Sequence, residues 1–154
     1  MEAKIRRILV AVDFSAAGAN AVETAQAYAV RFGAGLTLVH VLHLTDNLFG
    51  TGTFAFPDSA RQIAEAARVE LDKVAGGIRA AGLDCRTDVL HGTPDEQLRL
   101  FALDPVHQID LLVVGTHGRT GLARVAFGSV AQRILQSSPC PVLVVPSRPT
   151  PAAT

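Results

Sequence analysis

The residues with the clearest chemical meaning lie in a glycine-rich stretch over 113–135, which reads VVGTHGRTGLARVAFGSVAQRIL. Glycine stands at 115, 118, 121 and 128, and Ser129 follows the last of them. Glycine lets the backbone approach a ligand closely and adopt positive φ. Gly128, Ser129 and Val130 would also present free backbone N–H groups at a helix start, where the helix dipole favours an anion. The stretch therefore predicts a phosphate site, to which the Ser129 hydroxyl would add one hydrogen bond.

Two familiar phosphate-binding motifs do not fit this chain. A Walker A loop needs G-x-x-x-x-G-K-[ST], and no glycine here precedes Lys-Ser or Lys-Thr. A dinucleotide fingerprint needs G-x-G-x-x-G between the first strand and helix, where this chain has Asp13-Phe14-Ser15. The G-x-G at 33–35 precedes a strand and is interpreted as a helix stop. What remains is a pair of glycines at 115 and 118, nine residues, and then Gly128-Ser129.

The segments that must position this stretch alternate in their hydrophobic pattern. Short runs rich in Val, Ile and Leu predict strands, and longer amphipathic segments predict helices. At 93–96, Thr-Pro-Asp-Glu is a good helix start, with threonine at the cap and glutamate placed to reach back. The polar third strand is expected near a sheet edge. We expect strands at 5–13, 36–44, 85–92, 109–115 and 141–145, and helices at 16–32, 58–80, 94–103 and 129–136.

This alternation predicts an α/β fold, a single Rossmann-like domain with a five-stranded, mainly parallel sheet and helices on both faces. In such sheets ligands bind beyond the carboxyl ends of the strands, where the strand order reverses. The glycine-rich stretch begins at the carboxyl end of the fourth strand, so the fold puts it where a ligand would be. The long loop at 45–58 could be a lid, a partner contact or a plain cover, and the sequence leaves its role open.

Composition restricts the function classes. The chain has 154 residues, and its 14 basic and 14 acidic side chains cancel, which leaves no overall charge to attract nucleic acid or an acidic membrane. The N-terminal apolar run is too short for a signal peptide, and no apolar run approaches the roughly 20 residues of a membrane span. Two cysteines suggest no disulfide framework. We expect a cytoplasmic protein with one domain over 1–146 and a flexible proline-rich tail over 147–154.

The stretch GTHGRTGLARVAFGS, with a first strand ending VAVDFS and a last one reading PCPVLVV, closely resembles the universal stress protein family. The nucleotide-binding branch of that family carries the signature G-2x-G-9x-G-[ST], and this sequence matches every fixed position. The resemblance covers the chain from Ile5 to Pro146. It implies an ATP-binding, nucleotide-dependent sensor or regulator of the stress response, with ATP bound with or without Mg²⁺. Whether the ligand is ATP, ADP or a cyclic nucleotide stays open.

The resemblance also implies which residues form the ATP site. Asp13, at the end of the first strand, would accept a hydrogen bond from ribose or adenine, and the backbone of Val41 would meet the adenine edge. The ribose and phosphates would pass over the fourth strand's end and reach the last helix. The implied binding residues are Ala11, Val12, Asp13, Val41, Val114, Gly115, Gly118, Gly128, Ser129 and Val130.

Several of these residues have a simpler alternative. Asp13 could merely cap the first helix, and Ser15 is interpreted as a helix cap. His40 lies in an apolar strand and is interpreted as a hydrogen-bonded core histidine rather than a catalyst. His117 and Arg119 could contact phosphate or only solvent.

The sequence supports no catalytic or metal-binding residues. There is no Walker lysine, no clear acidic pair for magnesium and no obvious base for water. A Ser15–His40–Asp13 triad can be assembled on paper but lacks a nucleophile elbow, and the five histidines show no zinc spacing. We therefore expect a nucleotide binder with at most slow ATP hydrolysis. The alternatives are a slow ATP hydrolase and a dimeric stress scaffold that binds no nucleotide.

The last strand, at Val142–Val145, predicts the partner. It is short, apolar and near the sheet edge by topology, and an uncovered edge invites pairing with another chain. The family resemblance likewise implies a homodimer whose last strands pair about a two-fold axis. The alternative is an edge protected by Pro139, Pro141 and Pro146.

Overall fold

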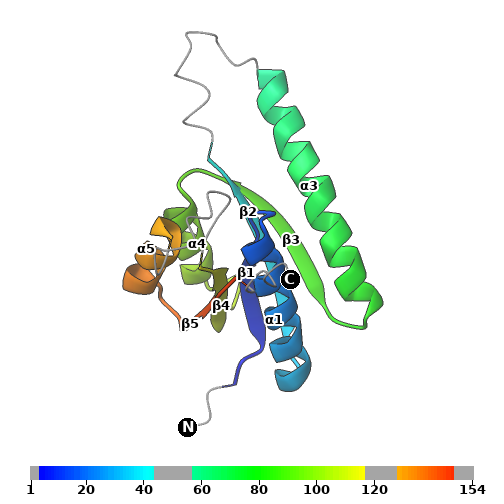
Figure 1. Cartoon of the computed structure of the whole chain (residues 1–154), viewed down its shortest axis with the longest axis vertical. Helices are drawn as coiled ribbons and strands as arrows, with labels where there is room; N and C mark the ends of the chain where they lie inside the picture. The colour runs from blue at the N-terminus through cyan, green and yellow to red at the C-terminus, as the bar shows by residue number, and fades with distance from the viewer. Residues whose placement is uncertain (1–3, 44–56, 117–127, 148–154) are drawn as a thin grey trace, which may run out of the picture.

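A computed structural model of the chain describes residues 4–43, 57–116 and 128–147 (Figure 1). Five strands and four helices alternate within these ranges. None of these helices is both long and apolar enough to cross a bilayer. In chain order the elements are β1 (Arg7–Ala11), α1 (Ala16–Phe32), β2 (Gly35–Leu42), α3 (Pro57–Ala80), β3 (Cys85–His91), α4 (Pro94–Leu103), β4 (Leu111–Gly115), α5 (Ser129–Ser137) and β5 (Val142–Val145).

The predicted order of elements is confirmed, and the predicted boundaries are wrong by a few residues at several ends. The strand expected over 5–13 spans only Arg7–Ala11, because the chain leaves the sheet at Asp13–Phe14, where Phe14 adopts a φ of 61°. Helix α3 begins at Pro57, one residue before the start expected from the range 58–80. Most of the predicted loop, 45–56, and the tail residues 148–154 lie outside the described residues.

The five strands form one parallel sheet in the order β3-β2-β1-β4-β5. The polar strand β3 and the last strand β5 are the two edges, as predicted. From β1 the chain winds outward to β2 and β3, then returns to the other side of β1 for β4 and β5. The strand order therefore reverses between β1 and β4, and the ligand crevice of such a sheet is expected at their carboxyl ends.

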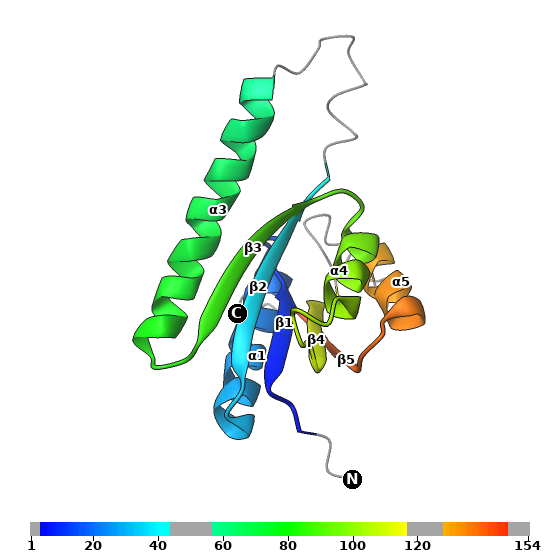
Figure 2. The same ribbon diagram turned by 180° about the vertical axis from the view of Figure 1, so that it is seen from behind.

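Helices cover both faces of the sheet, α1 and α3 on one face and α4 and α5 on the other (Figures 1 and 2). Side chains of a strand point alternately to the two faces, so the fully buried run Ile8-Leu9-Val10 supplies both cores. Ile8 and Val10 pack with the α1 and α3 side chains, and Leu9 packs with those of α4 and α5. A continuous apolar run is what a central parallel strand requires.

Local signals fix the helix ends next to the crevice. Ser15 is the N-cap of α1, because its hydroxyl oxygen accepts the backbone N–H of Gly18 at 3.0 Å. Gly33 ends α1 in the left-handed conformation. Thr93 and Pro94 occupy the predicted cap and first positions of α4, but the Thr93 side chain makes no capping hydrogen bond, so that part of the prediction is wrong.

Candidate functional site

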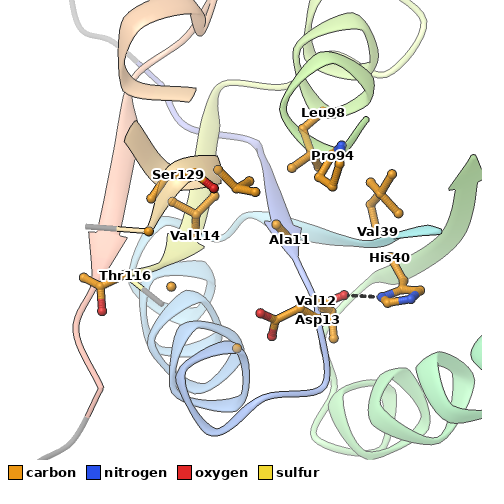
Figure 3. Close-up of a pocket in the computed structure, with 16 residues that line it drawn as sticks. Ala11, Val12, Asp13, Val39, His40, Pro94, Leu98, Val114, Thr116 and Ser129 are labelled. Atoms are coloured by element: carbon orange, nitrogen blue, oxygen red, sulfur yellow. Dashed lines mark hydrogen bonds between the residues drawn. The ribbon is translucent and has the colours of Figure 1, made fainter. Parts of the chain in front are cut away.

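A pocket lies at the carboxyl ends of β1, β2 and β4, closed by the first turns of α1, α4 and α5 (Figure 3). Its volume is about 230 Å³. Nine of the ten residues implied by the family resemblance line it, and the tenth, Gly118, lies outside the described residues, as do His117 and Arg119. The lining residues are Ala11, Val12, Asp13, Gly18, Val39, His40, Val41, Pro94, Leu98, Val114, Gly115, Thr116, Gly128, Ser129, Val130 and Ala131.

The sequence did not identify the apolar wall of this pocket. Val39 and Val41 lie on the same face of the sheet, and Pro94 and Leu98 of α4 lie near Val39 (Figure 3). The alternation of β2 could have identified Val39 as a partner of Val41. Pro94 and Leu98 reach the pocket only through the packing of α4, and their local sequence carries no such signal. Gly18, Thr116 and Ala131 were also missed.

Asp13 holds the start of α1 and faces the pocket at the same time. Its Oδ1 accepts the backbone N–H of Ser15 at 3.0 Å and the Ser15 hydroxyl at 2.5 Å. The Ser15 hydroxyl in turn accepts the backbone N–H of Gly18, so Ser15 is the cap, as predicted. Asp13 holds the Ser15 hydroxyl in place. The alternative in which Asp13 itself caps the helix is wrong. Its carboxylate forms part of the pocket wall, where it can accept hydrogen bonds.

The backbone of Val41 is presented toward the pocket by the geometry of the ladder. Odd-numbered residues of β2 bond to β1: Gly35 N donates to Arg6 O, and Val39 O accepts from Val12 N. Even-numbered residues bond to β3, as Leu42 O accepts from Gly92 N. Val41 thus directs both its N–H and its C=O toward β1, beyond the last β1 pair at Ala11 and Val39. Within the described residues these two groups have no backbone partner.

His40 forms the next part of the wall. Its Nδ1 lies 2.6 Å from the carbonyl oxygen of Val12, and its ring packs on Phe14 with the ring centroids 4.7 Å apart (Figure 3). A carbonyl oxygen only accepts, so Nδ1 carries the proton. The prediction of a hydrogen-bonded histidine is confirmed. Its placement in a closed core is wrong, because His40 is partly exposed and lines the pocket.

Gly115 and Gly128, the two described glycines of the motif, differ in what their positions require. Gly115 does not adopt positive φ, contrary to expectation. A Cβ at Gly115 would instead lie 3.1 Å from the backbone carbon and oxygen of Ala17, so the end of β4 packs directly on the first turn of α1. Gly128 is the N-cap of α5, with a φ of −65° and no side-chain cap.

The N-terminus of α5 presents fewer free donors than predicted. Gly128 N–H is not free, because it donates to Thr116 O at 2.6 Å. The next N–H groups, of Ser129 and Val130, have no intrahelical acceptor and no acceptor elsewhere in the described chain. Two backbone donors and the Ser129 hydroxyl therefore border the pocket at the positive end of α5.

The Asp13 and His40 side chains of this pocket are bonded to a neighbouring side chain or to the backbone. The Ser15 hydroxyl donates to Asp13, while His40 bonds to Val12 O, so these three side chains do not form the triad that can be drawn from the sequence. Nor does the described part of the chain bring together three side chains of the metal-binding types. What the pocket offers is an apolar slot, a backbone donor and acceptor, a carboxylate and the positive end of a helix.

A parallel, doubly wound sheet with a pocket at the switch between β1 and β4 defines a Rossmann-like α/β protein. The sequence profile of the universal stress protein family matches residues 4–146, and the chain belongs to this family. The predicted family is thereby confirmed.

One relative by sequence and two solved structures are similar to this chain. The "universal stress protein in QAH/OAS sulfhydrylase 3′ region" of Thermus aquaticus is 31% identical over 141 residues, covering 91% of this chain and 98% of the relative. The solved structure of MJ0577, from Methanocaldococcus jannaschii, superposes with a TM-score of 0.81 at 22% identity, covering 96% and 99% of the two chains. A universal stress protein crystallised in complex with cAMP has a TM-score of 0.66 at 25% identity, covering 94% of this chain and 99% of that one.

Proposed function

We propose that this protein binds an adenine nucleotide, with ATP as its ligand, and serves as a nucleotide-dependent sensor in the stress response. The observation that carries the proposal is the pairing of two features in one pocket. The Val41 N–H and C=O form a donor–acceptor edge at one end, and the uncapped N-terminus of α5 lies at another. Adenine offers the complementary acceptor and donor at N1 and N6, and a phosphate fits a helix N-terminus. The Asp13 carboxylate lines the same pocket and can accept a hydrogen bond from a ribose hydroxyl.

The volume of the pocket suits the base and sugar of a nucleotide, and the phosphates would lie outside it. Small-molecule pockets usually have volumes of about 300–1,000 Å³. At about 230 Å³ this pocket suits the base and sugar, with Val39, Val41 and Leu98 against the ring faces. The phosphates would then extend past Ser129. Mg²⁺ would come with ATP, held mainly by the phosphates, as is usual for this ion.

Any nucleotide that copurifies is first released by heating the protein and identified by chromatography. Calorimetric titration with Mg-ATP, cAMP and Mg-GTP then tests which base the pocket prefers. Guanine places N1–H and O6 where adenine has N1 and N6, so both of its groups would oppose like groups of Val41. Each unmet hydrogen bond costs about 1–3 kcal/mol, and we expect GTP to bind at least about tenfold more weakly. Equal affinity for GTP would contradict the role of the Val41 edge.

Two variants locate the ligand. Asp13→Ala should weaken the binding of every ligand that carries a ribose, and tripolyphosphate, which has none, serves as the control ligand. Gly118→Val combined with Gly128→Val should abolish nucleotide binding and leave the fold intact by circular dichroism. If the wild type binds none of these ligands, the protein acts instead as a stress scaffold without nucleotide.

We also propose a homodimer through β5. Backbone groups of Pro141 and Val145 face β4, because Leu112 N donates to Pro141 O and Thr116 N donates to Val145 O. By alternation Val142 and Val144 direct their backbone groups to the outer edge of the sheet, where a second β5 can pair. Val144→Pro removes one outward N–H and no bond to β4, so it should give a folded monomer in light scattering. A dimer that survives this change would pair elsewhere. Residence in the cytoplasm stays a prediction from the cysteine content.

A further inference from the structure

The hydrogen-bond ladder between β1 and β2 ends one bond early, although both segments continue far enough to form the next bond. Its regular course is fixed by Gly35 N to Arg6 O at its start and by Val12 N to Val39 O, 2.8 Å long, near its end. The next bond in this series would join Val41 N to Val12 O. That bond is absent, although β2 continues to Leu42 beside β3.

His40 occupies the acceptor that Val41 would otherwise use. Its Nδ1–H donates to Val12 O at 2.6 Å, drawn as the dashed line in Figure 3. Side chains of β2 alternate between the faces: Leu38 and Leu42 pack on the α1 and α3 side, and His40 shares their parity. His40 therefore binds the Val12 carbonyl from that side of the sheet, and this bond directs the carbonyl oxygen out of the plane in which a ladder bond to Val41 N–H would form.

The residues that follow Val12 secure this arrangement. Phe14 adopts a φ of 61° and packs its ring on the His40 imidazole. Asp13, between them, bonds to Ser15 at the start of α1. The segment in which the chain leaves β1 is thus held both by a side chain of β2 and by the cap of α1.

We propose that His40 is a positioning residue that keeps the Val41 N–H open for a ligand base by holding the carbonyl of Val12. The expected effect on binding rests on the proposed function, whereas the effect on the Val41 amide exists in the protein without ligand. His40 would act through the backbone of its neighbour and not by touching a reacting group.

Three substitutions separate this role from general packing. His40→Leu removes the donor, so Val12 O becomes available to Val41 N–H. His40→Asn retains an N–H close to the Nδ1 position and should preserve the bond to Val12 O. His91→Leu is the matched control, since His91 is exposed at the end of the neighbouring strand β3.

Amide hydrogen exchange of Val41, followed by NMR on the protein without ligand, is the direct test. We expect rapid exchange in the wild type, in His40→Asn and in His91→Leu, and at least tenfold slower exchange in His40→Leu. A Val41 amide already protected in the wild type, or unchanged in His40→Leu, would overturn the proposal. If His40→Leu does not fold, His40→Asn is compared with His40→Gln. The longer Gln side chain places its amide away from Val12 O, so Val41 exchange should be slower in His40→Gln than in His40→Asn.

Ligand affinity gives the second measurement. In His40→Leu we expect ATP affinity to fall about tenfold, equal to about 1.4 kcal/mol, with tripolyphosphate affinity unchanged. His40→Asn should stay within about twofold of the wild type. A parallel loss of both affinities together with thermal stability would show a merely structural histidine and overturn the proposal. Should no variant bind nucleotide while the Val41 exchange changes as expected, the proposed function fails and the role of His40 stands.

Discussion

Gly115→Ala is the substitution for which the structure gives the most specific expectation. A Cβ at this position would lie 3.1 Å from the backbone carbon and oxygen of Ala17 and 3.2 Å from the Ala17 Cβ. Such distances are shorter than ordinary carbon contacts of about 3.5–4.0 Å. Either the end of β4 or the first turn of α1 has to move by a few tenths of an ångström. Neither moves easily, since β4 lies between β1 and β5 and α1 begins at the Asp13–Ser15 cap.

The expected cost follows from this contact. Overpacking a well-packed interior costs about 1–3 kcal/mol, and we expect the lower half of that range because a single methyl group is added. For a domain of this size each kcal/mol corresponds to about 2–4 °C in Tm. In urea unfolding without ligand, the free energy of unfolding of Gly115→Ala should therefore be about 1–2 kcal/mol lower than that of the wild type.

The matched control is Gly76→Ala in α3, where a new Cβ meets nothing within 4 Å. Replacing an interior helical glycine with alanine should stabilise the protein by up to about 1 kcal/mol. The two alanine variants should thus change stability in opposite directions. If Gly115→Ala is as stable as the wild type and loses only nucleotide affinity, Gly115 serves ligand approach, and the packing argument is refuted.

Three further predictions concern a helix cap, a buried cysteine and a carboxylate beside the start of β4. Ser15→Ala should lower the free energy of unfolding by about 1 kcal/mol, because α1 loses its cap to Gly18 N, and denaturant titration measures it. Burial raises the pKa of the Cys85 thiol from 9.0 to about 11, so the folded protein keeps a proton that the unfolded chain releases. Stability should therefore fall between pH 9 and pH 11, by at most about 3 kcal/mol, and Cys85→Val should remove this slope in chemical unfolding at a series of pH values. Asp110→Ala should cost about 1–3 kcal/mol in the same assay, because Asp110 Oδ2 accepts the backbone N–H groups of Arg6 and Arg7.

Local pattern was sufficient to predict the fold. Four of the five strands are short apolar runs, and the polar run at Cys85–His91 lies at an edge of the sheet, as predicted. Strand ends were harder to predict, because they depend on where a neighbouring strand leaves the sheet. The apolar letters continue to Val12, but the turn at Phe14 ends β1 at Ala11.

The candidate site was predicted where a motif or a strand end marked it, and missed where tertiary packing creates it. Leu98 is an ordinary apolar residue on an amphipathic helix, and only the position of α4 brings it to the pocket. Gly115 was correctly placed at the strand end, but its conformation was wrongly expected, because a glycine demanded by a neighbour such as Ala17 looks the same in sequence as one demanded by a turn. The bond from His40 to Val12 O likewise joins residues 28 positions apart and has no local signature.

The charges around the pocket would also give the proposed nucleotide a direction. Three helices begin at this pocket, and a helix N-terminus carries a partial positive charge. At α1 that charge is met by the Asp13 carboxylate through Ser15, and at α4 by Asp95 and Glu96 in the first turn. Helix α5 has neither an acidic residue in its first turn nor a side-chain cap. An anion is therefore best placed at α5, so in the proposed complex the phosphates would lie toward Ser129 and the base at the Val41 edge.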